Sequence, residues 1–379
     1  MKIAYYMPFK PMGHKNPSGD LVTGTELFNY LSEKEYSIEL VSRLRCRWIY
    51  YQPQVWYQYL SEKRRIIKKY RDKKPAIWLS YHSYYKAPDL LGSSCSKALD
   101  IPYVIFQGIY STKRRKKLKT LPGFLLNRRV LQSADQIITN KKRDFKNLQR
   151  VVSEDCLTYI APGINPDDFV FSPASRNTLR KKWNRENRLI VMTAAMFRPG
   201  VKTEGIMQVI KSCAQLTGKG KDFCLWIGGD GACRNELKKS ADELLPGKVR
   251  FLGKIPRSEM YLYYSAADIF AFPGIEESLG MVYLEAQSCN LPVVAYGDWG
   301  GGEAIIHNQT GLLSSADEQA RFTENIDRLL CDSELRSNFG QSGGSHIRSH
   351  HDLKQNYTLL EEKLRMVATA HSKIKHRRQ

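Results

Sequence analysis

The chain alternates short apolar runs with longer amphipathic segments, and it does so in two successive sets. The first set holds candidate strands at residues 2–7, 37–43, 76–82, 102–108, 136–140 and 157–163. After a polar stretch, the second set holds candidate strands at residues 189–196, 223–229, 249–253, 269–274, 292–296 and 310–315. Short apolar strands separated by helical segments are typical of parallel sheets that helices cover on both faces. The sequence therefore predicts an α/β protein with two doubly wound sheets.

The length of the chain agrees with two domains. At 379 residues it is longer than one hydrophobic core usually supports, and 42% apolar with 26% charged residues is a globular composition. We place an N-terminal domain at 1–170, joined by a C-terminal helix at 350–379, and a C-terminal domain at 171–349. Ligands of doubly wound domains bind beyond the carboxyl ends of the strands. We therefore expect the functional site in a cleft between the carboxyl ends of the two sheets.

Positive charge is concentrated in the first half of the chain. The formal net charge is +21, and residues 1–170 hold 30 Lys and Arg against 15 Asp and Glu. Two basic runs, at 62–74 and 113–129, carry most of the excess, and the second also contains five large apolar residues between 118 and 126. Basic residues beside apolar ones suit an anionic membrane surface. We therefore expect the N-terminal domain to bind such a surface.

Two other interpretations of this charge stay open. The run at 62–74 is equally compatible with a charged helix that water alone solvates. Nucleic acid is a third partner, because a positive balance favours phosphate backbones. No helix-turn-helix, zinc-finger or RNP-like aromatic pattern accompanies the charge, so nucleic acid is the least favoured of the three.

Cysteine usage and hydropathy indicate the compartment. The eight cysteines are scattered, without a CxxC pair or metal-ligand spacing, which is typical of free thiols in a reducing compartment. The apolar part of residues 1–13 is too short for a signal peptide and predicts a first strand. No window approaches the roughly 18 apolar residues that span a bilayer. We expect a cytoplasmic protein, bound at most to the surface of a membrane.

The strongest motif is EESLGMVYLEAQSCNLPVVA at 276–295, which holds Glu277 and Glu285 on either side of a glycine. It resembles the E-x7-E signature of family 4 (group 1) retaining glycosyltransferases of the GT-B fold, bacterial surface-polysaccharide type. Further stretches fall in that family's order: APGINPDDF (161–169), FRPGVK (197–202), GGDG (228–231), LGKIPRSEM (252–260), SAADIFAFPG (265–274) and GGGEAIIHNQTGLL (300–313). The resemblance implies two Rossmann-like domains, with a C-terminal helix that crosses back to the first.

The resemblance also assigns the parts of a nucleotide-sugar site. Glu285 would accept hydrogen bonds from ribose hydroxyls and Glu277 from hydroxyls of the donor sugar, because charged carboxylates are strong acceptors. The amides of Leu279, Gly280 and Met281, at the expected start of a helix, would bind the distal phosphate. The base would meet backbone groups near Ile255, in the GKIP stretch.

Cations and a glycine loop complete the donor side. Arg198 and Lys202, in the loop after the first strand of the second domain, would neutralise the pyrophosphate. No Asp-x-Asp motif is present, so we expect no metal and no cofactor, with the nucleotide sugar as co-substrate. Gly19 matches one glycine of the family's Gly-Gly loop, whereas Ser18 replaces the other. Asp20 would either orient an acceptor hydroxyl or cap the following helix.

The acceptor side departs from the family. His82, at the end of a strand, matches a histidine that often lines this side, although a histidine there is also commonly structural. Gln107 stands after the next strand, where many members carry a second histidine, and glutamine can donate a hydrogen bond but is no general base. Glu303 would steady the loop after Gly300.

The resemblance implies a metal-independent hexosyltransferase that uses a UDP- or GDP-linked sugar and retains the anomeric configuration. We identify no carboxylate nucleophile for a double displacement, so front-face departure and attack is expected. The acceptor would be a saccharide or glycolipid of lipopolysaccharide, O-antigen, capsule or a similar glycan, at the inner face of a bacterial plasma membrane. Two alternatives remain: a GT-B phosphorylase, and a non-catalytic carbohydrate- or nucleic-acid-binding protein with the same fold.

Overall fold

A computed structural model describes residues 1–14, 19–34, 36–183 and 187–378, with side chains described except at 19, 20 and 374–378. The chain divides into two compact units: unit 1 is Met1–Ile160 with Tyr357–Gln379, and unit 2 is Ala161–Asn356. The sequence placed this division at 170/171. The compact units divide earlier because Ile164 and Phe169 are buried in the core of unit 2.

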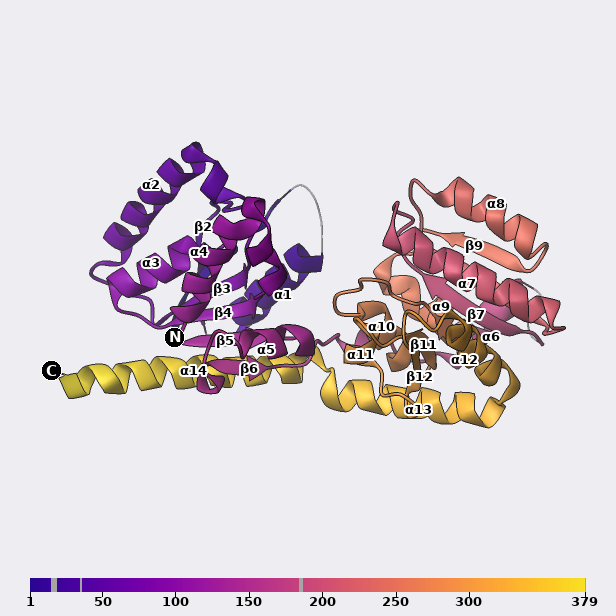
Figure 1. Ribbon diagram of the computed structural model, residues 1–379. Coiled ribbons are helices and arrows are strands. Elements are labelled where there is room, and N and C mark those ends of the chain that lie inside the picture. Colours follow the sequence, from indigo (N-terminus) through magenta and orange to yellow (C-terminus); the bar gives the residue numbers. More distant parts are fainter. Residues whose placement is uncertain (15–18, 35, 184–186, 379) are drawn as a thin grey trace. The chain divides into compact units, whose positions relative to one another are not determined.

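Unit 1 contains a parallel six-stranded sheet, built from its described residues in the order β2-β1-β3-β4-β5-β6. The strands are β1 (Lys2–Tyr6), β2 (Ser37–Ser42), β3 (Ile77–Ser83), β4 (Tyr103–Gly108), β5 (Gln136–Thr139) and β6 (Leu157–Tyr159). The helices are α1 (Gly19–Glu33), α2 (Pro53–Tyr70), α3 (Leu90–Leu99), α4 (Leu121–Gln132) and α5 (Lys142–Leu148) (Figure 1). Short 3₁₀ turns are η1 (Ile49–Tyr51), η2 (Thr112–Lys116), η3 (Leu118–Thr120) and η4 (Glu154–Cys156).

The last helix, α14 (Leu353–Arg378), begins in unit 2, and its residues from Tyr357 onward belong to unit 1. Two tyrosines of unit 1 hold it there. Tyr30 donates to Glu361 Oε1 at 2.5 Å and Tyr36 donates to Glu361 Oε2 at 2.9 Å. Leu360 and Leu364 are fully buried on the same helix. The C-terminal segment therefore completes the N-terminal unit.

Unit 2 contains a second parallel sheet, six-stranded over its described residues, in the order β12-β11-β10-β7-β8-β9. The strands are β7 (Leu189–Ala194), β8 (Phe223–Gly228), β9 (Val249–Gly253), β10 (Ile269–Ala271), β11 (Val293–Tyr296) and β12 (Gly311–Ser314). The helices and 3₁₀ turns are η5 (Pro166–Asp168), α6 (Pro173–Lys182), α7 (Val201–Gly218), α8 (Arg234–Leu244), η6 (Arg257–Glu259), α9 (Met260–Ala266), α10 (Met281–Ser288), α11 (Gly301–Ala304), α12 (Gln319–Cys331) and α13 (Ser333–His350).

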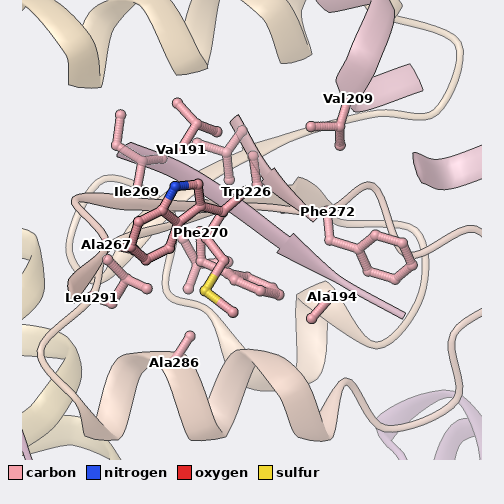
Figure 2. Packing of buried hydrophobic residues seen from close by; sticks show 14 of the residues in the cluster. Val191, Ala194, Val209, Trp226, Ala267, Ile269, Phe270, Phe272, Ala286 and Leu291 are labelled. Carbon is pink, nitrogen blue, oxygen red and sulfur yellow. The ribbon is translucent and has the colours of Figure 1, made fainter. Parts of the chain in front are cut away.

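The core of unit 2 lies on both faces of its sheet. Val209 of α7 and Ala286 of α10 approach the strands from opposite sides, and Trp226 and Phe270 fill the space around the strands (Figure 2). These residues are 0–1% exposed. Because helices cover both faces of the sheet, each strand is a continuous run of apolar residues. This is why the positions of the strands could be predicted from the sequence.

Every strand predicted from the sequence is present, which confirms the fold class of two doubly wound parallel sheets. Two strands are shorter than predicted by at least three residues. β6 ends at Tyr159 and β10 at Ala271. Pro162 and Pro273 follow within three residues, and proline has no amide hydrogen for the ladder. Among the described helices, none is both long and apolar enough to cross a membrane.

Candidate functional site

The candidate donor residues of unit 2 lie at the switch point of its sheet. β7 and β10 are neighbours, and from β7 the chain proceeds to β8 on one side, whereas from β10 it proceeds to β11 on the other. Connections that leave adjacent strands in opposite directions open a crevice at their carboxyl ends. The segment with Arg198 and Lys202 follows β7, and the segment with Glu277 and Glu285 follows β10.

Lys202 and Glu277, which the sequence assigned to different parts of the ligand, form an ion pair between Nζ and Oε2. Both side chains are 21% exposed. Lys202 lies in the first turn of α7, and its Nζ is 5.5 Å from the centre of the Phe272 ring. The pair thus presents a cation and an acceptor at one point, where a ligand with both negative charge and hydroxyl groups can engage them together.

Glu285 lies inside α10, where its residue is 7% exposed. Its Oε1 accepts a hydrogen bond from Arg257 Nε at 3.1 Å, and its Oε2 accepts one from the Tyr264 hydroxyl at 3.2 Å. Burial raises the pKa of Glu285, and the Arg257 guanidinium and Tyr264 hydroxyl offset part of that rise. The carboxylate is therefore held in one orientation before any ligand binds.

Arg257 and Tyr264 are the residues that sequence reasoning missed on the donor side. Arg257 stands in the LGKIPRSEM stretch, two residues after Ile255, and its side chain is 51% exposed. The signal was present, since a basic residue follows the stretch expected to meet the base. The pairing of Arg257 with Glu285, which lies 28 positions later in the chain, could not be predicted from the local sequence.

The loop between β10 and α10 is held by glycines and one tyrosine. Gly280 precedes α10 with φ of 65°, and a Cβ there would lie 2.7 Å from the Gly300 carbonyl oxygen. The Gly300 amide donates to the Glu277 carbonyl at 3.0 Å, and the Tyr283 hydroxyl donates to the Phe272 carbonyl at 3.0 Å. Leu279 and Met281 flank Gly280 and are half-buried. The backbone around Gly280 is thereby fixed at the start of the helix, where amides lack partners inside the helix.

Replacing Gly280 with alanine should destabilise this loop. The positive φ disfavours any L side chain, and the new Cβ would lie 2.5 Å from the Tyr283 ring. We expect the free energy of unfolding to fall by about 1–3 kcal/mol. The control is Gly218→Ala at the end of α7, where a Cβ meets open space among the described atoms. Urea denaturation of both variants checks the prediction, and equal stabilities would contradict it.

Arg198 lies in a loop that the GGDG turn holds in place. The Phe197 amide donates to the Asp230 carbonyl at 3.1 Å. Gly229 has φ of 132°, and a Cβ there would lie 1.9 Å from the Ala195 carbonyl oxygen, so only glycine permits this approach. The Arg198 side chain is exposed at this edge. The turn therefore holds the backbone of the loop in place, and the exposed guanidinium of Arg198 can contact a ligand.

Ile255 lies beside the same turn. Its Cδ1 is 3.2 Å from the position of a Cβ built on Gly228, and the Gly229 amide donates to the Gly253 carbonyl at 2.8 Å. Ile255 is thus at the carboxyl end of β8 and β9, on the side of the sheet that also carries Arg257. Glu303 lies in the first turn of α11, after Gly300.

On unit 1, His82 and Gln107 occupy equivalent places on neighbouring strands. β3 and β4 pair so that the residues on either side of these two are partners, and both have positive φ, 71° for His82 and 68° for Gln107. Both are buried, and Gln107 Nε2 donates to Asn140 Oδ1. The His82 ring lies 4.8 Å from that of Tyr84. Left-handed non-glycine residues cost about 1–3 kcal/mol each and gather at functional sites.

A buried charged pair beside these residues was also missed. Lys141 and Asp144 are 7% and 3% exposed, and Nζ lies 4.0 Å from Oδ2. Burial raises the pKa of Asp144, and Lys141, Arg143 and His82 lower it in part. The pair follows β5, and a run of charges directly after a strand was the available signal. The predictions for Gly19 and Asp20 concern residues that lie outside the described side chains.

Residues 175–346 match the family model described as glycosyl transferases group 1. A GDP-mannose-dependent alpha-(1-6)-phosphatidylinositol monomannoside mannosyltransferase of Mycolicibacterium smegmatis is 29% identical over 195 residues, 49% of this chain and 50% of the relative. A D-inositol 3-phosphate glycosyltransferase of Corynebacterium jeikeium is 30% identical over 237 residues, 59% of this chain and 55% of the relative. The chain thus spans about half the length of these curated relatives.

Solved structures match over nearly the whole chain. Anabaena Alr3699/HepE in complex with UDP superposes with a TM-score of 0.75 and 16% identity, over 97% of this chain and 100% of that one. At this identity the match establishes the fold. The sequence match of unit 2 and the fold of both units agree with the motifs found in the sequence. Residues 175–346 are therefore similar to the group 1 glycosyl transferases, and the chain has the GT-B fold.

Proposed function

We propose that this protein is a retaining glycosyltransferase that moves a hexose from a nucleotide-diphosphate sugar to a saccharide or glycolipid acceptor. The observation that carries the proposal is the pair of cation–carboxylate contacts, Lys202–Glu277 and Arg257–Glu285, on either side of the glycine that begins α10. A nucleotide-diphosphate sugar has an anionic centre with polyol rings on both sides. Its chemistry complements this arrangement.

Each group has a defined role in the proposal. Glu285 accepts hydrogen bonds from the ribose and Glu277 from the donor sugar. Arg198, Lys202 and the amides that begin α10 stabilise the negative charge that grows on the leaving diphosphate. Removing one such donor from a comparable site typically lowers kcat by about 100- to 1,000-fold. We expect no metal, since these cations occupy the place where one would act.

The stereochemical part of the proposal is retention by front-face transfer. The leaving phosphate accepts the proton of the acceptor hydroxyl, and the bond to that hydroxyl forms on the face from which the phosphate departs. The protein contributes orientation and charge stabilisation. On this proposal no residue of the chain forms a covalent bond to the sugar.

Nucleotide binding is the first test of the donor. We expect one of UDP, GDP and ADP, or one of their sugar conjugates, to raise the melting temperature of the wild type. Stabilisation is about 2.7 kcal/mol at 100 times the dissociation constant. Glu285→Gln should abolish the shift, whereas Glu243→Gln, an exposed glutamate on α8, should keep it. GDP-mannose comes first in the panel, because a relative at 29% identity is named GDP-mannose-dependent.

Three results would contradict the donor proposal. A shift that Glu285→Gln leaves unchanged would remove the ribose role. Sugar cleavage that requires inorganic phosphate and no nucleotide would favour a phosphorylase. Salt-dependent DNA binding without any nucleotide-sugar binding would favour the non-catalytic alternative.

For the acceptor we propose an anionic glycolipid or lipid-linked glycan at a membrane surface, on the cytoplasmic side of a bacterial plasma membrane, in lipopolysaccharide or a similar surface glycan. The support lies in unit 1, where η2 carries Lys113, Arg114, Arg115 and Lys116 and the next turn begins with Leu118, which is 87% exposed. Tyr51 is 51% exposed, and its hydroxyl donates to the Lys119 carbonyl at 3.0 Å, so η1 and η3 share this surface.

Vesicle binding tests this surface. Each basic residue near an anionic membrane contributes about 1 kcal/mol, so Arg115→Ala/Lys116→Ala should weaken binding about 30-fold. The control is Lys238→Ala/Lys239→Ala on α8, which removes the same charge from exposed positions of unit 2. Co-sedimentation with phosphatidylglycerol-containing vesicles measures both. Equal losses of vesicle binding in the two variants would show that only net charge matters. That result would refute the proposal that this surface of unit 1 binds the membrane.

A further inference from the structure

Unit 2 contains a second concave site beside α7. A groove of about 470 Å³ lies between this helix and the loops that follow β10, β11 and β12. Its lining includes Glu204, Met207 and Lys211 of α7, together with Ile275 and Trp299 of the loops. The volume falls in the range of roughly 300–1,000 Å³ that holds small ligands.

The groove is adjacent to the candidate donor site and separate from it. Within the described part of the chain, its lining shares no side chain with the Lys202–Glu277 pair or with the Glu285 cluster. Ile275 precedes Glu277 by two residues, and Trp299 precedes Gly300, whose amide donates to the Glu277 carbonyl. The loops that hold Glu277 therefore also form two walls of the groove.

Trp299 provides a supported aromatic surface in the groove. Its residue is half-buried, and its ring lies 6.5 Å from that of Tyr296, which is 2% exposed and packs in turn on Phe322. The indole is thus backed by the core of unit 2. A rigid aromatic face of this kind binds the apolar face of a ligand at little cost in conformational entropy.

The charges of the lining restrict the ligand. Glu204 and Glu236 oppose an anion, and Lys211 opposes a cation. Gln208 and Gln319 add neutral groups that both donate and accept hydrogen bonds. The groove therefore matches an uncharged ligand with many hydroxyl groups and one apolar face. This is unlike the donor site, where cations face an anionic ligand.

We propose that this groove is an accessory site for a neutral saccharide, separate from the site of the donor. The sugar ring stacks on Trp299, and its hydroxyls hydrogen-bond to Glu204, Gln208 and Glu236. The saccharide binds without any covalent change. The inference goes beyond the proposed function, and its test requires no enzymatic activity.

The test is a titration of the full chain with maltotriose and mannotriose, followed by saturation-transfer NMR and calorimetry, with glucosamine and glucuronic acid as charged comparators. We expect a neutral trisaccharide to bind more tightly than either charged sugar. Trp299→Ala should weaken binding at least about tenfold, which corresponds to about 1.4 kcal/mol. Tyr57→Ala, which removes an exposed aromatic residue from α2, should leave the affinity unchanged.

Two further variants keep the test decisive if Trp299→Ala does not fold. Glu204, which is exposed, and Gln208, which is half-buried, lie within α7, where alanine favours the helix; Glu204→Ala and Gln208→Ala should each weaken binding. The saccharide should still bind in the presence of saturating UDP or GDP. The proposal is overturned if no neutral trisaccharide binds, if a charged sugar binds more tightly, if nucleotide displaces the saccharide, or if the α7 variants bind as the wild type does.

Discussion

Glu277→Gln should lower kcat/KM by about 100- to 1,000-fold, in line with the loss of one charged contact to a transition state. Glutamine keeps the size of the side chain but removes the charge that pairs with Lys202. The donor hydroxyls would lose a strong acceptor, and the Lys202 ammonium would lose the partner that orients it. Release of nucleoside diphosphate from the active nucleotide sugar measures the effect.

The neighbouring residue provides the matched control for Glu277→Gln. Glu276 is exposed, and Glu276→Gln makes the same chemical change one position earlier. We expect its kcat/KM to stay close to that of the wild type. Equal activity of the two variants, at unchanged thermal stability, would show that Glu277 has no special role.

The ion pair also predicts how two substitutions combine. Lys202→Met alone leaves Glu277 without its cation, and Glu277→Gln alone leaves Lys202 without its carboxylate. Residues in contact are usually non-additive, so the double variant should lose less activity than the product of the two single losses. Purely multiplicative losses would show that the two side chains act on the ligand independently.

Asp268→Ala should lower the free energy of unfolding by about 3–5 kcal/mol, because it leaves the buried Arg180 and the half-buried Arg176 without their carboxylate. Asp268 follows α9, and its Oδ1 accepts from Arg176 at 2.5 Å while its Oδ2 pairs with Arg180. Oδ2 also accepts from the Ile190 amide at 2.7 Å, at the start of β7. The Asp268 side chain is 9% exposed. Chemical denaturation of unit 2 measures the change.

Asp222 is the control for Asp268, since it also has two basic partners but is exposed to solvent. Its carboxylate is 3.2 Å from Arg188 and 3.6 Å from Lys248, and the side chain is 59% exposed. Exposed pairs contribute about 0–1 kcal/mol, so Asp222→Ala should change stability little. A loss as large as that of Asp268→Ala would mean that burial is not what makes the Asp268 network strong.

The location of the strands could be predicted from the sequence because each is a continuous apolar run between polar segments. The same holds for the start of α10, where Gly280 between two glutamates follows an apolar strand. These signals are local, since they depend on residues within one or two turns of each other. The ends of β6 and β10, at Tyr159 and Ala271, were missed by only a few residues, although the nearby Pro162 and Pro273 are local signals.

The contacts between distant residues required the tertiary structure. Lys202 and Glu277 are 75 positions apart, and only the strand order, which places β7 beside β10, brings them together. The positive φ of His82 and Gln107 could not be predicted from the sequence either. Most residues other than glycine avoid the left-handed region, so tertiary packing must impose it. The groove beside Trp299 is lined by residues of three helices, α7, α8 and α12, and of the segments that follow three strands, from separate parts of the chain.

The sequence by itself thus determined the fold class, the strands and the family motifs of this protein, since hydrophobic periodicity and motif spacing are properties of short segments. The tertiary structure decided that Lys202 pairs with Glu277, that Arg257 and Tyr264 orient Glu285, and that the chain divides at Ala161. The physical reason is that these features depend on which strands are neighbours and how their loops pack, and residues far apart in the chain set both.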